Sequence, residues 1–249
     1  KVQLDSMMSL SSNRGDNIAV VDLSPYGSMV SNAAGNAGTV NSSYAATYWP
    51  WLQVGSATGR NEFVPAGVVI PGVYVFTDNA AAPWFAPAGL TRGGIPNVIQ
   101  AERKLTRSQR DTLYAANVNP IATFPGSGIS VFGQKTLQKK KSALDRVNVR
   151  RLLIDLKKFL GDAAKNIVFE QNTIATRNSF LSSVNPYLES VVQRQGLYAF
   201  RVVMDDTNNT ADVIDRNQLI GQIFIQPAKT AEFISLDFVI MPTGATFGA

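Results

Sequence analysis

The side chains of this chain that could carry chemistry are carboxylates, lysines and tyrosines, because the sequence contains no histidine and no cysteine. Histidine titrates nearest to neutral pH and is therefore the commonest general base and metal ligand. Its absence excludes Ser-His-Asp and Cys-His catalysis, and the absence of cysteine excludes disulfides and zinc sites with sulfur ligands. A carboxylate enzyme such as a glycosidase stays an alternative, but no facing pair of acids stands out. We therefore expect no catalysis, no metal and no cofactor.

Three short motifs approach known sites without completing them. Residues 128–136 differ from a P-loop because Gln134 interrupts the required Gly-Lys-Ser/Thr sequence, and strand-forming residues occupy the loop. Arg14, Gly15 and Asp16 match the integrin-binding tripeptide, for which a turn is the simpler interpretation. The third motif is a group of four acidic residues whose spacing does not match a calcium-binding loop: Asp205, Asp206, Asp212 and Asp215. We interpret all three motifs as structural.

Positive charge is concentrated in the middle of the chain. Between residues 101 and 165, fourteen Lys and Arg stand against five Asp and Glu, a net charge of +9. The rest of the 249-residue chain carries nine against thirteen, a net charge of −4. Such a basic segment favours an acidic partner, which could be nucleic acid, a membrane surface or an acidic protein.

The clearest element in this basic segment is a helix predicted over residues 143–164, with Ser142 and Asp145 as a capping-box-like start. Apolar residues at helical spacing form one face of this helix. Three basic residues form a stripe beside that face: Arg146, Arg150 and Lys157. We predict that the stripe contacts an acidic surface. The alternative is a solvated flank whose aliphatic stems cover apolar residues.

The first half of the chain predicts fewer regular elements. We expect a loop at residues 28–43, and a short helix before Pro50 with a strand after it. The apolar run at residues 64–78 fits either a helix from Pro71 or a strand at 72–76. The clearest further elements are strands at 17–22, 121–124 and 129–132 and a helix at 106–116 capped by Thr106.

Strands and helices alternate in the second half, which predicts an α/β (α+β) fold with a mixed sheet packed against helices. After the basic helix we expect a strand at 167–169, a helix at 174–195 ended by Gly196, and strands at 199–204 and 222–226. We divide the chain into residues 1–98, strands and structured loops, and residues 99–249, the main α/β domain. No apolar run approaches the ~20 residues of a membrane span.

A last strand is predicted at residues 231–241, near the end of the chain. Its strand-forming residues are Phe233, Leu236, Phe238 and Ile240. A terminal strand of this kind is available for pairing with another chain. We therefore expect an extended terminal segment that joins subunits.

Seven stretches of the chain resemble, in order, the tail sheath proteins of contractile phages. Among them are SSYAATYWPWLQV (42–54), PWFAPAGLTRGGI (83–95) and DRVNVRRLLIDLKKFL (145–160). The others are VIPGVYVFTD, LYAANVNPIATFPGSGISVFGQKTL, VFEQNT and PAKTAEFISLDFVI. The form APAGLTRGG is most similar to the sheaths of T4-like phages, whereas Phe132 stands where the family commonly has Trp. The chain is thus identified as a member of this family, from the C-terminal part of the protein.

The resemblance implies a structural subunit rather than an enzyme. Members form hexameric rings that stack helically around the tail tube protein, between baseplate and tail terminator proteins. They contract to drive the tube through the host cell envelope, and exchanged terminal strands tie neighbours together. The resemblance implies location in the virion tail after assembly in the host cytoplasm, without nucleic acid or membrane as partner. Two alternatives stay open: the sheath of a bacteriocin or secretion system, and a basic nucleic-acid-binding protein.

Overall fold

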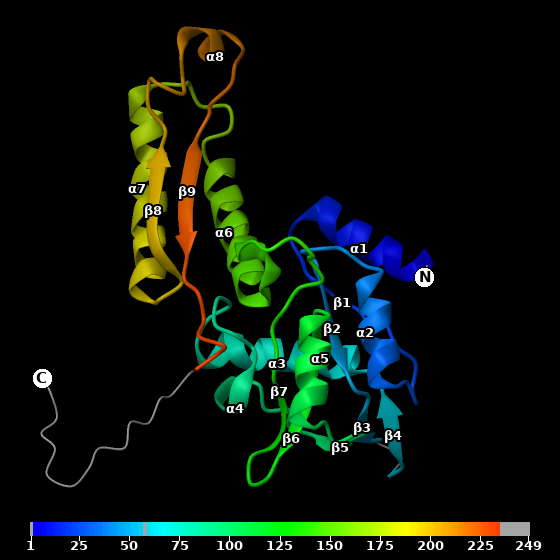
Figure 1. The fold of residues 1–249 in the computed structure, drawn as a ribbon. Helices are drawn as coiled ribbons and strands as arrows, with labels where there is room; N and C mark the ends of the chain where they lie inside the picture. Colours follow the sequence, from blue (N-terminus) through cyan, green and yellow to red (C-terminus); the bar gives the residue numbers. More distant parts are fainter. Residues whose placement is uncertain (1, 57–58, 235–249) are drawn as a thin grey trace, which may run out of the picture.

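The computed structural model describes residues 2–56 and 59–234 and has the predicted mixed α/β fold (Figure 1). The helices are α1 (Val2–Arg14), α2 (Val30–Gly38), α3 (Ala66–Ala80), α4 (Gly89–Arg92), α5 (Arg107–Ala115), α6 (Val147–Lys165), α7 (Ile174–Gln193) and α8 (Ala211–Asp215). The strands are β1 (Ala19–Val20), β2 (Ala45–Trp49), β3 (Leu52–Gly55), β4 (Asn61–Val64), β5 (Val98–Ala101), β6 (Val118–Phe124), β7 (Gly128–Val131), β8 (Leu197–Val203) and β9 (Gln222–Pro227). We call residues 2–146 the body and residues 147–227 the lobe.

The body is built on a four-stranded sheet in the order β1-β2-β6-β7. The first three strands are parallel, and β7 pairs with β6 in antiparallel register. Alternate residues of β2 face two different cores. Ala46 and Tyr48 pack with α3, whereas Ala45 and Trp49 pack with α1, α2 and α5. All five residues of β2 are therefore buried.

A second sheet of the body has the order β4-β3-β5, with both pairs antiparallel. Strand β3 follows β2 after the cis Trp49–Pro50 peptide bond, so the same chain passes directly from one sheet to the other. Leu52, at the start of β3, is fully buried in the core that contains α3. This shared core holds the two sheets together.

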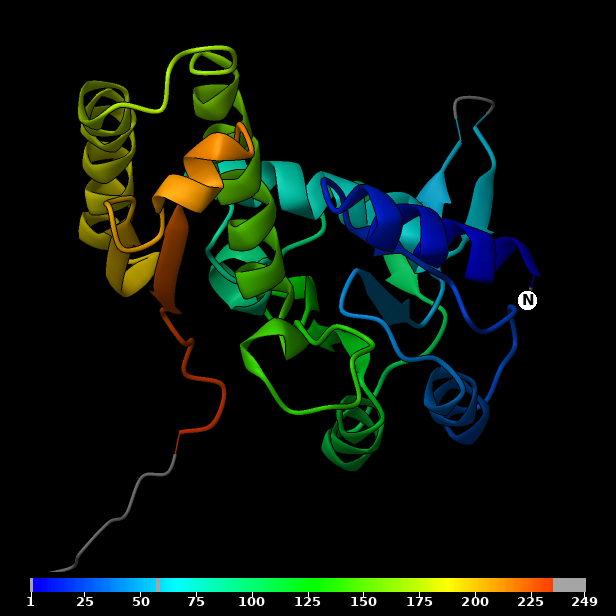
Figure 2. The same cartoon turned by 90° about the horizontal axis from the view of Figure 1, so that it is seen from above.

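The lobe is an antiparallel pair of strands, β8 and β9, packed on α6 and α7. Figures 1 and 2 show α6 standing between α7 and the body. Strand β9 alternates: Ile223 and Ile225 are partly buried against the helices, whereas Phe224 is 55% exposed on the opposite face. This alternation is typical of a strand with one face on a core.

No helix is predicted within the first 43 residues, where the structure has α1 and α2. Residues 2–14 form α1, and the predicted loop at 28–43 contains α2, while the predicted strand at 17–22 is confirmed by the short β1. Helix α2 packs through Ala33 and Ala37, which are four residues apart and lie on one face. Side chains this small give little periodic signal, so the sequence resembled a loop.

The aromatic and apolar segments were predicted correctly only in part. The segment before Pro50, predicted as a helix, is strand β2. The prediction failed because a strand buried on both faces shows no alternation of polar and apolar residues. The strand after Pro50 is confirmed. Helix α3 begins at Ala66 rather than Pro71, and the alternative strand at 72–76 is wrong. Burial of Ile70 and Val73 in the core holds the helix through Pro71.

The predictions around the long helices need three corrections. Ser142 caps only a short 3-10 helix, Ala143–Asp145, and α6 begins at Val147. Arg146 between them is extended and forms a bridge with Lys135. The predicted strand at 167–169 is a turn, and Gln195 rather than Gly196 takes the left-handed conformation after α7, at φ 63°. Gly196 is required for space, because a Cβ there would lie 2.6 Å from Val191 Cγ1.

Three further predicted elements agree with the structure. Thr106 caps α5 through a complete capping box with Gln109. The predicted strands around residues 121–132 are β6 and β7, and those near 199–226 are β8 and β9. The predicted domain boundary at residues 98 and 99 stays a prediction.

Candidate inter-subunit surfaces

The three residues of the predicted basic stripe have different surroundings. Arg146 precedes α6 and forms an ion pair with Glu232, at 2.7 Å between Nε and Oε1. Arg150 is only 4% exposed; its guanidinium lies 3.9 Å from the Tyr44 ring centroid and donates to the Ser43 carbonyl oxygen. Burial lowers the pKa of Arg150 below its ordinary value. The stripe is thus divided, and its contact with an acidic surface stays a prediction.

Lys157 is the member of the stripe that the structure leaves exposed. Its ammonium donates a 3.4 Å hydrogen bond to the Tyr44 hydroxyl, whose ring also stacks under Arg150. Two of the three predicted residues therefore meet at Tyr44. A single exposed cation at this position can exchange a weak hydrogen bond for another partner at little cost.

Arg151 forms a joint between lobe and body that the sequence did not indicate. Its guanidinium donates to both carboxylate oxygens of Asp78 on α3 and lies 4.6 Å from the Tyr74 ring centroid. Asp78 is 73 residues away in sequence, so no local pattern could have identified the pair. Together with Arg150 this joint fixes the start of α6 on the body.

A second cluster missed by sequence reasoning surrounds Glu232. Tyr114 Oη donates to Glu232 Oε2 at 2.8 Å, and Gln134 Nε2 donates to Oε1 at 3.1 Å. Arg146 donates to both oxygens, at 2.7 and 2.9 Å. Burial alone would raise the pKa of Glu232, but the hydrogen bonds from Arg146 and Tyr114 outweigh it and lower the pKa. Burial and the adjacent carboxylate raise the pKa of Tyr114, which keeps its proton as the donor.

The predicted inter-subunit strand lies mostly outside the described residues. Phe233 is 82% exposed and Ile234 is 79% exposed, and neither belongs to a strand. Leu236, Phe238 and Ile240 lie beyond residue 234, outside the described residues. Pairing of this segment with another chain stays a prediction.

Each strand of the lobe has one neighbour among residues 2–56 and 59–234, because the sheet order is β8-β9 alone. Each therefore has one free edge in the described part of the chain. Tyr198 of β8 is 60% exposed and Phe224 of β9 is 55% exposed. An edge with unpaired backbone groups and exposed aromatic side chains is a template for a further strand.

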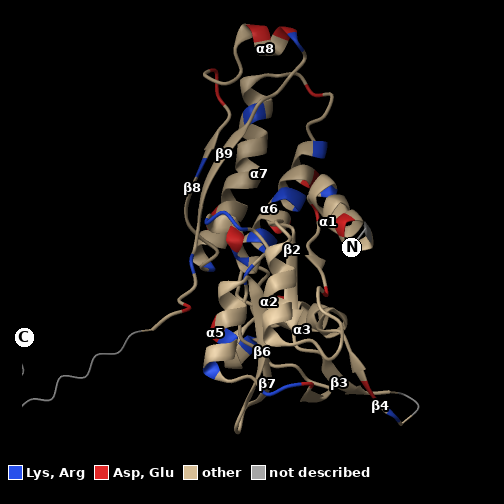
Figure 3. Ribbon diagram, turned by 45° about the vertical axis from the view of Figure 1, so that its right-hand side comes forward, with Lys and Arg blue, Asp and Glu red and all other residues tan. Residues whose placement is uncertain are grey.

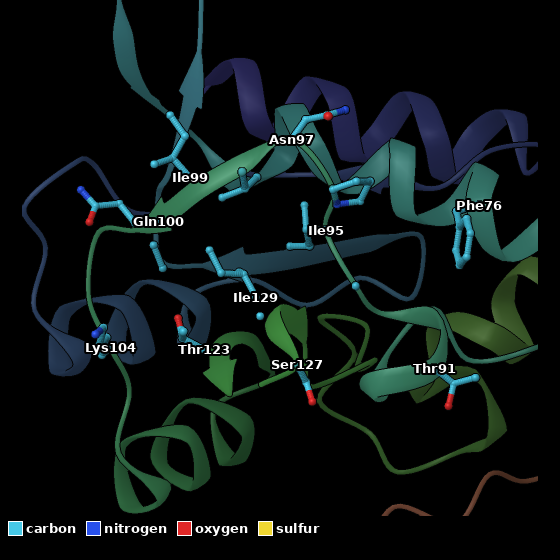
Figure 4. A pocket seen from close by; sticks show the side chains of 15 residues that line it. Phe76, Thr91, Ile95, Asn97, Ile99, Gln100, Lys104, Thr123, Ser127 and Ile129 are labelled. Atoms are coloured by element: carbon cyan, nitrogen blue, oxygen red, sulfur yellow. The ribbon is translucent and has the colours of Figure 1, made fainter. Parts of the chain in front are cut away.

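Two grooves of the described surface are lined mainly by uncharged residues. One groove of about 830 Å³ lies between β5 and the β6–β7 hairpin (Figure 4). Figure 4 shows Ile95, Ile99 and Ile129 around it, and its one ionisable lining residue in the described chain is Lys104. A second groove beside α6 and α8 has Glu170 as its one ionisable lining residue there.

The three short motifs are accounted for by local structure. Residues 128–131 of the near P-loop form strand β7, as predicted. Arg14 and Asp16 form an ion pair across Gly15. In the acidic turn, Asp205 accepts from the backbone N–H of Thr207, and Asp206 pairs with Arg177. Among residues 2–56 and 59–234 there is no group of three metal-ligating side chains and no helix suited to crossing a membrane.

Charge is distributed unevenly between the two parts (Figure 3). Lys and Arg gather where α6 meets the body, whereas α8 at the far end of the lobe carries Asp212 and Asp215. Part of the basic segment, including Arg146, Arg150 and Arg151, therefore lies at the junction of lobe and body.

Two family profiles and several named proteins are similar to this chain. The family profile described as phage tail sheath protein central domain matches residues 4–137, and that of the phage tail sheath C-terminal domain matches residues 139–241. The tail sheath protein of Vibrio phage KVP40 is 45% identical over 188 residues, 76% of this chain and 28% of that protein. The tail sheath protein of Enterobacteria phage T4 is 42% identical over 187 residues, 75% of this chain and 28% of that protein. The chain thus matches little more than a quarter of each relative.

Solved structures resemble the chain over most of its length. The sheath complex of an extracellular contractile injection system, PVC, in its contracted state has a TM-score of 0.80 and 26% identity, covering 89% of this chain and 63% of that one. The helical sheath of the anti-feeding prophage in its contracted state has a TM-score of 0.76 and 25% identity, covering 93% and 64%. Profiles, relatives and structures agree, and the chain belongs to the phage tail sheath family.

Proposed function

We propose that this chain is part of the subunit of a phage contractile tail sheath. The subunit polymerises as hexameric rings stacked around the tail tube and contracts to drive the tube through the host cell envelope. The identities of 45% and 42% to tail sheath proteins of two phages support a phage tail over an injection system. The contracted sheath assemblies of similar fold support helical self-association.

The observation that carries this proposal is the open strand pair of the lobe. The pair is covered by α6 and α7 on one face, but within the described residues each of its strands has an edge of backbone groups that no strand pairs with, which is a template for a further strand. Phe233, Leu236, Phe238 and Ile240 supply a strand-forming segment that follows β9 in the sequence. A neighbouring copy can therefore supply the strand that each lobe lacks. Such a head-to-tail contact uses two different surfaces and generates rings or helical filaments.

The proposal includes the predicted contact with the tail tube. Lys157 is its best-supported residue because its ammonium is exposed at the junction where basic residues gather. The remaining proposed partners are the baseplate and tail terminator proteins, in the virion tail, after assembly in the host cytoplasm. We propose no catalytic step, no cofactor and no binding to nucleic acid or membrane.

The test is deletion of residues 233–249 from the complete sheath protein. Electron microscopy of the wild-type protein should show striated tubes, and the deletion should yield none. Thermal unfolding checks that the deleted protein still folds, which we expect because the exposed Phe233 and Ile234 lie outside the cores. Striated tubes at wild-type yield from the deleted protein would contradict the proposal.

A further inference from the structure

The chain leaves the lobe after β9 and crosses to the body as a segment without regular secondary structure (Figure 1). The last backbone contact with the lobe is the hydrogen bond from the Ala228 N–H to the Gly196 carbonyl oxygen, at 3.1 Å. Four residues later, the Glu232 carboxylate is bound by Tyr114, Gln134 and Arg146. We call these four residues the Glu232 clamp.

The members of the clamp come from separate parts of the body. Tyr114 lies on α5, Gln134 follows β7, and Arg146 precedes α6. Gln134 is 3% exposed and its Nε2 also donates to the Thr230 hydroxyl. Arg146 presents two donors to the two carboxylate oxygens, a geometry that fixes orientation as well as position. The clamp thus holds one point of an otherwise irregular segment in a defined direction.

Beside the clamp, a carboxylate is shielded from solvent while the apolar side chains that follow it are exposed. The Glu232 side chain is 15% exposed, whereas the next residues, Phe233 and Ile234, are 82% and 79% exposed. Lys229, Thr230 and Ala231 before it are exposed too. Folding normally buries apolar side chains and leaves carboxylates in water. A segment that shields the carboxylate of Glu232 and exposes the ring of Phe233 is suited to contact with a second surface.

We propose that the Glu232 clamp is the anchor that fixes where the C-terminal segment leaves its own subunit and so positions that segment for a second copy of this chain. This inference rests on the proposed polymerisation through the C-terminal segment. Glu232 is in this sense a positioning residue, since the contact itself is made by the apolar residues that follow. Anchoring the root of the segment restricts the volume its end explores, which raises its effective concentration at the neighbour and lowers the ordering entropy of docking.

The local test is hydrogen exchange in the complete sheath protein, before polymerisation. Glu232→Gln keeps the side-chain size and removes the charge, and Arg146→Gln removes the guanidinium from the opposite side. Each should speed exchange of the amides of residues 228–234 by about tenfold, while the amides of β6 keep their protection. The matched control is Asp162→Asn, which removes the exposed ion pair with Lys165 and should change neither region. Unchanged exchange at 228–234 in both clamp variants would overturn the proposal.

The assembly test compares the clamp variants with the deletion of residues 233–249. If the clamp positions the segment, the deletion abolishes tubes, and Glu232→Gln lowers their yield at least about fivefold with an unchanged thermal midpoint. If Glu232→Gln fails to fold, Tyr114→Phe, which removes one donor and keeps the ring, takes its place. Loss of tubes in the deletion but wild-type yield in the clamp variant overturns the clamp and leaves the proposed function standing. Wild-type tubes from the deletion overturn both.

Discussion

Body and lobe differ in how their strands are completed. In the body, β2 has a neighbour on each side and a core on each face, and its five residues are all buried. In the lobe, β8 and β9 have one partner each within the described residues, and each carries an exposed aromatic side chain. The body has central strands, β2, β3 and β6, with a neighbour on each side, whereas the lobe has none within the described residues; we propose that a strand of another chain completes it. Helix α6, tied to the body through Arg150 and Arg151, carries the lobe on this base.

The comparison predicts its largest effect between a buried strand position of the body and an exposed strand position of the lobe. Ile121→Ala in β6 removes a fully buried side chain and should lower the free energy of unfolding by about 2–5 kcal/mol. Phe224→Ser in β9 changes a side chain on the outer face, and unfolding in denaturant should differ by less than about 0.5 kcal/mol. The Phe224 variant should instead reduce tube formation. A loss of stability in Phe224→Ser equal to that in Ile121→Ala would show that the lobe is as complete as the body.

A smaller effect separates Arg150 from Lys157 on the joint between the two parts. Arg150→Glu places a carboxylate against the Ser43 carbonyl oxygen in a buried site, which should cost about 1–3 kcal/mol in unfolding free energy. Lys157→Glu, at an exposed site, should change it by less than about 0.5 kcal/mol. Only the Lys157 variant is then a clean test of tube contact, through co-assembly of extended sheath with tube. Wild-type co-assembly and salt dependence in that variant would make Lys157 a solvated residue.

The smallest effect is a pH dependence at the crossing between lobe and body. The pKa of Glu232 is lowered in the folded chain, so the clamp contributes its full stability above the unfolded value of about 4.3 and loses it as pH falls through the folded value. The groups that face the carboxylate are Arg146, Tyr114 and Gln134, with Lys135 and Asp145 nearby. The difference in unfolding free energy between wild type and Glu232→Gln should therefore shrink below about pH 4. A difference that stays constant from pH 7 to pH 3 would contradict this account.

The sequence predicted the elements whose signals are local. The N-cap at Thr106, the strands beside the turn at Gly126 and Gly128, and the amphipathic face of α6 all follow from residues close in the chain. Strand β2 was mistaken for a helix because burial on both faces removes the alternation that identifies a strand. Helix α2 was missed because alanines pack without a strong periodic pattern.

The site was predicted less well than the fold because its contacts join residues far apart in the sequence. The stripe of Arg146, Arg150 and Lys157 assumed one continuous helix, but the bridge between Lys135 and Arg146 delays the helix to Val147. Glu232 meets Tyr114 across 118 residues and Arg146 across 86, so only the tertiary fold brings them together. Contacts of this range carry no periodicity or spacing that a single sequence exposes.

The most direct measurement of the central claim is a cryo-electron microscopy map of the assembled sheath in which the chain from residue 228 to 249 is traced. The account predicts that residues 229–232 stay on their own body at the Glu232 clamp. The apolar residues from Phe233 onward should add a strand to the β8–β9 pair of a neighbouring copy. A trace in which this segment pairs with the β8–β9 strands of its own subunit, or contacts no other copy, would contradict it.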